Sequence, residues 1–129
     1  MTNSTCTTRG ITVEVNSFLV PERSDPARRQ WLFAYRIQVT NRSEIAVSLI
    51  SRHWVITDAE GAVEEVRGPG VVGQQPRLQP GASFEYTSFC PLRTSFGTMH
   101  GSYQMVPDKG EAFDVEIAPF ALSEPHAIN

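Results

Sequence analysis

The clearest structural signal in the sequence is the stretch Trp31-Leu-Phe-Ala-Tyr-Arg-Ile-Gln-Val39. Every odd position holds a large apolar or aromatic side chain, whereas Arg36 and Gln38 occupy even positions. Alternation with a period of two places successive side chains on opposite faces of a β-strand. Aromatic and β-branched residues also favour strands. The stretch therefore predicts a strand that buries one face in a core.

Shorter segments with the same alternation lie on both sides of this stretch. Turn residues such as Asp58-Ala-Glu-Gly61 separate them, and no segment shows sustained helical periodicity. Recurring short strands with turns between them are typical of an all-β sandwich or barrel. The expected strands are 11–15, 31–39, 46–57, 62–66, 83–89, 100–106 and 112–117, with Pro119 ending the last one.

Length and composition fit one folded domain. The chain has 129 residues, of which 40% are hydrophobic and 19% charged, and such values are typical of globular proteins. We expect residues 1–9 to form a flexible N-terminal tail, 10–120 to form a single domain and 121–129 to form a frayed C-terminal tail. Residues 67–81 contain four glycines and three prolines, so we expect a loop there.

Charge and cysteine content indicate where the protein works. The formal net charge is −3, which gives no overall attraction to nucleic acids or to anionic membranes. Apolar runs are far shorter than the roughly 20 residues of a membrane span. The polar N-terminus lacks the apolar core of a signal peptide. We therefore expect a cytoplasmic protein in which Cys6 and Cys90 are free thiols.

The segment Gly68-Pro-Gly-Val-Val-Gly73 matches the pattern Gly-x-Gly-x-x-Gly. A dinucleotide-binding interpretation fails, because Pro76 and Pro80 exclude the helix that must follow the last glycine. Two interpretations remain open. The backbone N–H groups of Gly68, Gly70 and Gly73 could bind an anion with help from Arg67 and Arg77, although Pro69 lacks an N–H. Alternatively, the glycines serve a tight loop.

Other chemistry has weak support in the sequence. His53, His100 and His126 stand in no catalytic pattern, and there is no Gly-x-Ser-x-Gly motif, so we predict that the protein is not an enzyme. Asp114 and Glu116 would share one face of a strand, with Glu111 nearby. Carboxylates suit a divalent cation such as Mg²⁺ or Co²⁺, but they also keep exposed strands soluble. The arginines of Pro21–Arg29 are expected to form a solvated loop.

Taken together, several segments resemble the ApaG family. The resemblance covers about residues 10 to 120 and depends on the order and spacing of many segments. They are Phe33-Ala-Tyr35, Arg52-His-Trp-Val-Ile-Thr-Asp58, Val66-Arg-Gly-Pro-Gly-Val-Val-Gly-Gln-Gln-Pro76, Pro80-Gly81, Phe84-Glu-Tyr-Thr-Ser88, Gly97-Thr-Met-His-Gly-Ser-Tyr-Gln-Met105 and Phe113-Asp-Val-Glu-Ile117.

The resemblance implies an immunoglobulin- or fibronectin type III-like antiparallel β-sandwich. It also implies an association with cobalt and magnesium resistance or efflux, and a suggested pyrophosphate site at Gly68, Gly70 and Gly73. It supplies no catalytic residues. We therefore expect a non-catalytic module that binds an unknown protein partner. The alternative is a sensor of pyrophosphate- or nucleotide-like anions, with or without a divalent cation. Open sheet edges would allow a homodimer but do not require one.

Overall fold

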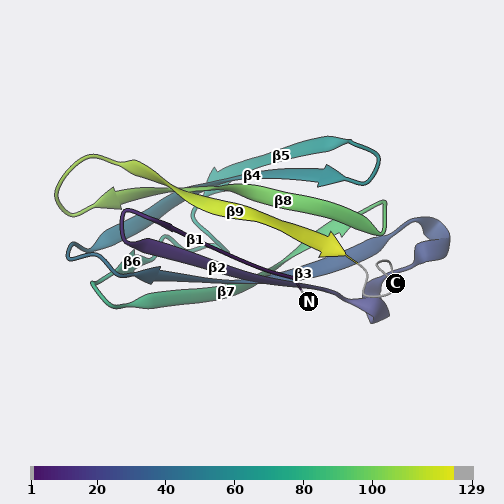
Figure 1. The fold of residues 1–129 in the computed structure, drawn as a ribbon, viewed down its shortest axis with the longest axis horizontal. Coiled ribbons are helices and arrows are strands. Elements are labelled where there is room, and N and C mark those ends of the chain that lie inside the picture. The colour runs from purple at the N-terminus through teal and green to yellow at the C-terminus, as the bar shows by residue number, and fades with distance from the viewer. Residues whose placement is uncertain (1, 124–129) are drawn as a thin grey trace.

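The computed structural model describes residues 2–123, which fold into two antiparallel β-sheets packed face to face (Figure 1). One sheet has the strand order β1-β2-β3-β7, and the other has the order β5-β4-β8-β9 with the short β6 beside β4. The predicted immunoglobulin- or fibronectin type III-like sandwich is confirmed. The strands are β1 Thr2–Thr8, β2 Ile11–Leu19, β3 Trp31–Asn41, β4 Val47–Asp58, β5 Val63–Pro69, β6 Arg77–Leu78, β7 Ser83–Leu92, β8 Phe96–Pro107 and β9 Phe113–Ser123, and the 3-10 helices are η1 Pro21–Arg23 and η2 Pro26–Arg28.

The alternation in β3 forms the centre of the core. Its odd-numbered side chains face the opposite sheet, and those of Phe33, Tyr35, Ile37 and Val39 are at most 6% exposed. They pack against the inner face of the second sheet, as the sequence predicts. The main residues of that inner face are Leu49, Trp54, Tyr103, Met105, Val115 and Ile117.

Two bulges change the alternation of the second sheet. In β4 the register with β8 shifts between Leu49 and Ser51, so buried positions are odd before Ile50 and even after it. In β9 the register shifts between the partners of Met99 and Gly101, which places Pro119 in a bulge. The prediction that Pro119 ends the last strand is wrong, because proline is tolerated where a bulge needs no ladder hydrogen bond.

The expected flexible N-terminal tail is also wrong for the described residues. Thr2–Thr8 pair with residues 11–17 of β2, through a tight turn in which Arg9 and Gly10 both have positive φ. Such turns match the twist of antiparallel strands. The expected loop 67–81 is shortened, since β5 extends to Pro69 and β6 lies inside it. At the C-terminus, 121–123 belong to β9, and the rest of the expected tail lies outside the described residues.

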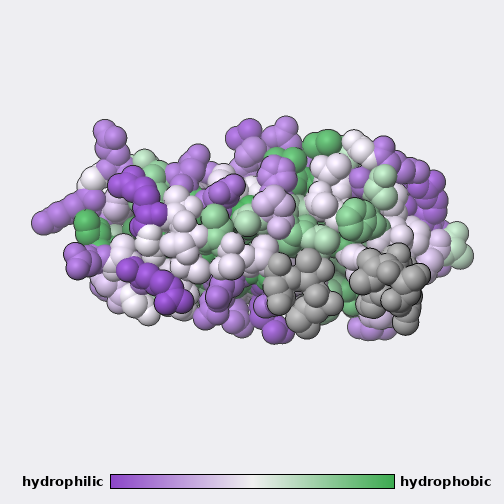
Figure 2. Space-filling model, viewed as in Figure 1, coloured by the Kyte–Doolittle hydropathy of each residue, from purple (hydrophilic) through white to green (hydrophobic). Residues whose placement is uncertain are grey.

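The two long sides of the sandwich differ. On one side β1 closes the gap to β9, because the Ser4 hydroxyl donates to the Ala118 carbonyl (3.2 Å) and Thr8 Oγ1 accepts from the Glu116 amide (3.2 Å). Figure 2 shows this side, where hydrophobic residues form separate patches among hydrophilic ones. On the other side the edge strands are β7 and β5, which do not pair with each other. The part of the chain that the structure describes therefore leaves the sandwich open along β5 and β7.

Candidate binding site

A groove runs between the sheets at the open side. Two hollows of about 330 and 260 Å³ lie there, and they share the lining residues Tyr35, Arg52, Trp54 and Ser88. The shared residues make the hollows two parts of one groove. The loop 69–73 borders one end, and the residues around Phe89 border the other.

Arg52 is the charged residue in the middle of this groove. It lies on β4 two positions before Trp54, opposite Tyr103 of β8, so its side chain faces the space between the sheets. Its Nη1 donates to the carbonyls of Pro69 and Gly70, both at 2.9 Å. Arg52 thus provides a positive charge beside apolar and aromatic walls.

Sequence analysis missed Arg52. A signal was available, because Arg52, Trp54 and Ile56 share one strand face by alternation. A charged residue on an otherwise apolar strand face is unusual, since burying a charge without a partner is costly. The partners that compensate Arg52 come from residues 17 and 18 positions away, so local patterns cannot reveal them.

Each glycine of the motif 68–73 has a structural role. A Cβ on Gly68 would lie 3.0 Å from the Arg52 guanidinium nitrogens, so Gly68 makes room for that group. A Cβ on Gly70, whose φ is +58°, would lie 2.1 Å from the Gln74 carbonyl oxygen. Gly73 has a φ of +80° in the turn that follows. The interpretation as a tight loop therefore explains all three glycines.

The tip of this loop is a two-residue turn. The amide of Val71 donates to the Gln74 carbonyl and the amide of Gln74 donates to the Val71 carbonyl, both at 2.8 Å. Val72 and Gly73 lie between them with positive φ, as type I′ turns require. Positive φ is unfavourable for a β-branched residue such as Val72. The half-exposed Val72 is thus held in a strained conformation beside the groove.

The bulge in β4 holds the loop in place. The Ile50 carbonyl accepts hydrogen bonds from the Gly70 amide (2.7 Å) and from Gln75 Nε2 (2.9 Å). Because the register with β8 skips Ile50, this carbonyl can bond the loop. Val71 is 1% exposed and anchors the loop in the core.

The arginines predicted to assist an anion site point to other partners. Arg67 is largely exposed and its Nη2 lies 3.7 Å from Glu65 Oε1. Arg77 binds the Asp108 carboxylate through Nε (3.2 Å to Oδ1) and Nη2, and this bond lowers the pKa of Asp108. The Gly70 amide already donates to the Ile50 carbonyl of β4, and the Val71 amide donates to the Gln74 carbonyl. Anion binding by the five residues together stays a prediction, and the cation beside the glycines is Arg52.

The predicted carboxylate pair lies on β9. Asp114 is opposite Gln104 and Glu116 is opposite Ser102, so both carboxylates share the outer face of the second sheet. Glu116 Oε2 accepts a hydrogen bond from Cys6 Sγ at 3.5 Å. Among residues 2–123, no cluster of three or more histidine, cysteine or acidic residues could hold a metal ion. Cation binding by this pair stays a prediction.

Burial raises the pKa of the acidic side chains that line the groove. It raises the pKa of Cys90 from 9.0 to about 12, with a smaller contribution from the charge of Glu64. It also raises the pKa of Tyr35, which Ser88 and Arg52 partly offset. Both cysteines are free, as predicted. The Cys90 thiol is therefore protonated at neutral pH and is a poor nucleophile there.

Fold and groove together define an antiparallel β-sandwich protein with an inter-sheet groove at one open side. Within that class, the chain belongs to the ApaG family, since the family model described as ApaG domain matches residues 21–107. The resemblance inferred from the sequence is thereby confirmed.

The similarity to known proteins extends over almost the whole chain. A protein named Protein ApaG from Anaeromyxobacter dehalogenans is 56% identical over 126 residues, which are 98% of this chain and 99% of that protein. Protein ApaG from Rhizobium etli is 52% identical over 118 residues, 92% of this chain and 91% of that one. A crystal structure of a Bordetella pertussis protein named as ApaA is 53% identical, with a TM-score of 0.88 over 91% of this chain and 95% of that one.

A distant structure shares only the fold. The C-terminal domain of wzt is 8% identical to this chain, with a TM-score of 0.56 over 97% of this chain and 79% of that one.

Among residues 2–123, the structure contains no helix with the length and apolar character that a membrane span requires.

Proposed function

We propose that this protein is a non-catalytic binding module of the cytoplasm that binds an extended segment of another protein along β7. The observation that carries the proposal is the open side, where the ten-residue strand Ser83–Leu92 pairs, among residues 2–123, with β3 only. A free strand edge can accept a further strand through main-chain hydrogen bonds. The groove beside β7 offers pockets for side chains of that segment.

Two exposed aromatic side chains, one on β7 and one on β2, support a binding surface beside β7. Phe89 is 50% exposed and lies across β3 from Phe18, which is 36% exposed, with Ala34 between them. Exposed aromatic side chains are enriched at protein interfaces. By contrast, the β1–β9 side is closed by two hydrogen bonds, which the Ser4 hydroxyl donates to Ala118 and the Thr8 hydroxyl accepts from Glu116. Recognition at β7 therefore leaves the closed side unchanged.

Site-specific crosslinking tests this function with a matched control. Glu14, Gln38 and Glu85 form one cross-strand row, and Glu85 lies at the free edge while Glu14 lies two strands away. A photo-crosslinking residue at Glu85 should capture a partner in cells, and the same residue at Glu14 should not. In the purified complex, the outward amides of residues 83–92 should exchange hydrogen more slowly. Equal capture at both positions, or unchanged exchange, rejects the proposal.

A second candidate is a pyrophosphate-like anion, and one observation favours it. The exposed turn at Val72 and Gly73 and the Arg52 guanidinium line the same hollow. A guanidinium forms strong, charge-assisted hydrogen bonds with phosphate oxygens. The turn could add backbone N–H groups from its tip. The family association with cobalt and magnesium belongs with this candidate, because such anions bind divalent cations.

Amide NMR with pyrophosphate tests the second candidate. Saturable shifts should cluster at Arg52 and at residues 70–74, and Arg52→Gln should weaken binding about tenfold or more. Arg67→Gln is the matched control and should have little effect. Gly70→Ala is unsuitable, because its Cβ would collide with the Gln74 carbonyl. Absent shifts, or equal loss in both variants, reject this site. Mg²⁺ or Co²⁺ alone should shift residues 111–116 if the carboxylate pair binds a cation.

A further inference from the structure

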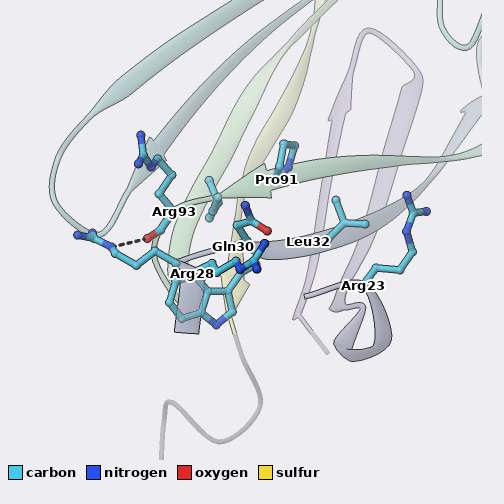
Figure 3. Close-up of a pocket in the computed structure, with 9 residues that line it drawn as sticks. Arg23, Arg28, Gln30, Leu32, Pro91 and Arg93 are labelled. Carbon is cyan, nitrogen blue, oxygen red and sulfur yellow. Dashed lines mark hydrogen bonds between the residues drawn. The ribbon is translucent and has the colours of Figure 1, made fainter. Parts of the chain in front are cut away.

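Four arginines surround a hollow at the end of β7. The hollow has a volume of about 480 Å³, and its lining includes Arg23, Arg28, Arg29 and Arg93. Figure 3 shows Arg23 at one end and Arg93 at the other, with Leu32 and Pro91 between them. The chain has 11 lysines and arginines and a net charge of −3. More than a third of its basic residues therefore lie around one hollow of an acidic protein.

The positive charge of this hollow is only partly compensated. Arg28 Nε lies 3.5 Å from Asp25, and Arg29 Nη2 lies 3.0 Å from Glu60. Arg23 and Arg93 form no ion pair with any residue in 2–123. Like charges held close together repel each other. An anionic group between them would remove that repulsion.

The arrangement is built by long-range contacts. Arg29 has a φ of +58° at the end of η2, and its Nε donates to the Arg93 carbonyl at 3.3 Å, linking the β2–β3 connection to the segment after β7. The guanidinium of Arg23 lies 5.8 Å from the centre of the Phe89 ring. The sequence predicted only a solvated loop here, because Arg93 is 64 residues from Arg29.

We propose that this hollow binds aspartate or glutamate side chains at one end of the protein segment that pairs with β7. This inference rests on the proposed function. Pro91 and Leu92 are the last residues of β7 and also line the hollow, so a segment that follows the strand edge reaches the arginines. Guanidinium groups bind carboxylates in a bidentate geometry. The apolar walls at Leu32 and Pro91 suit the aliphatic part of such side chains.

The probe is a fluorescent peptide of alternating valine and threonine that ends in a run of aspartates. Fluorescence anisotropy should detect its binding, and a matched peptide with asparagines should bind about tenfold more weakly or worse. The double variant Arg23→Glu/Arg93→Glu should lose the preference for aspartate. Both arginines are exposed, so the fold should persist, which circular dichroism verifies.

The matched control is Arg42→Glu, an exposed arginine just beyond the opposite end of β3, and it should keep the preference. Higher salt should weaken aspartate binding in the native chain. Equal affinity for both peptides, or no binding of either, overturns the inference. Inorganic phosphate and free aspartate are then compared as competitors of the bound peptide. If phosphate displaces the peptide at a lower concentration than aspartate does, the hollow prefers phosphate and the inference is overturned.

The same peptides separate this inference from the proposed function. A crosslinker at Glu85 should capture the aspartate peptide. If Glu85 captures both peptides and they bind with equal affinity, recognition along β7 is supported and carboxylate binding by the arginine hollow is rejected. If the preference for aspartate depends on Arg23 and Arg93 but Glu85 captures no peptide, carboxylate binding in the hollow is supported and strand pairing with β7 is rejected.

Discussion

Replacing Trp54 with alanine is expected to lower the free energy of unfolding by about 3–5 kcal/mol. The indole is 3% exposed and forms the wall between the core and the groove. Its ring centre lies 5.5 Å from that of Tyr35, 5.9 Å from Phe120 and 6.4 Å from Tyr103, all at steep angles. Edge-to-face contacts of this kind add to the free energy of burial. Because the free energy of unfolding of a domain is only about 5–15 kcal/mol, this one substitution should remove a large part of it.

The other tryptophan supplies the control. Trp31 is only partly buried at the start of β3, so Trp31→Ala should cost clearly less than Trp54→Ala. Urea unfolding followed by circular dichroism measures both variants with one probe, and the slope of the free energy against urea should not change. Similar losses in the two variants, or a loss below about 1 kcal/mol for Trp54→Ala, would contradict the packing described above.

Strand alternation was enough to predict the layered fold. It located the buried face of β3. It could not locate β1, because Thr2–Thr8 contain no run of apolar side chains; this strand is held by backbone pairing and by polar contacts to β9. It also failed at Pro119, because the bulge that accepts a proline depends on β8.

The candidate sites were harder to predict than the fold. The glycine pattern located a structured loop, but its partner Arg52 lies on another strand. The arginine hollow combines Arg93 with residues that precede β3, and only the folded chain brings them together. Both sites depend on contacts between distant segments, which a periodic pattern cannot encode.

The open and closed sides of the sandwich have different consequences for function. The closed side uses short polar side chains of β1 to satisfy β9, which blocks strand addition there. The open side keeps β7 free, with Arg52 in the groove and the arginine hollow at the end of the strand. One partner segment could therefore contact the strand edge, the groove and the hollow together.

High pH is expected to unfold the protein by ionising buried acids. The three tyrosines of the chain, Tyr35, Tyr86 and Tyr103, are all buried. Burial raises the pKa of each above the ordinary value of 10.0. The hydroxyls of Tyr86 and Tyr103 also bond to each other inside the core. The folded state therefore keeps these protons while the unfolded state releases them.

The sign of the pH dependence follows from these raised pKa values. Their contribution to stability is complete below the ordinary values of 9.0 for cysteine and 10.0 for tyrosine, and it is lost as pH rises towards the folded-state values. One pKa unit corresponds to about 1.4 kcal/mol. The Cys90 thiol, with its pKa near 12, therefore accounts for a loss on the order of 4 kcal/mol by itself.

Tyrosinate absorbance measures this directly. In the folded chain no tyrosine should ionise near pH 10, and all three should ionise together with the loss of circular dichroism at higher pH. In urea they should ionise with the ordinary pKa of 10.0. Cys90→Ala removes the thiol, so the loss of stability between about pH 8 and about pH 11 should be smaller in that variant. A folded chain whose tyrosines ionise near pH 10 would mean that the groove admits water to these hydroxyls, and the buried Tyr86–Tyr103 pair would then have to be abandoned.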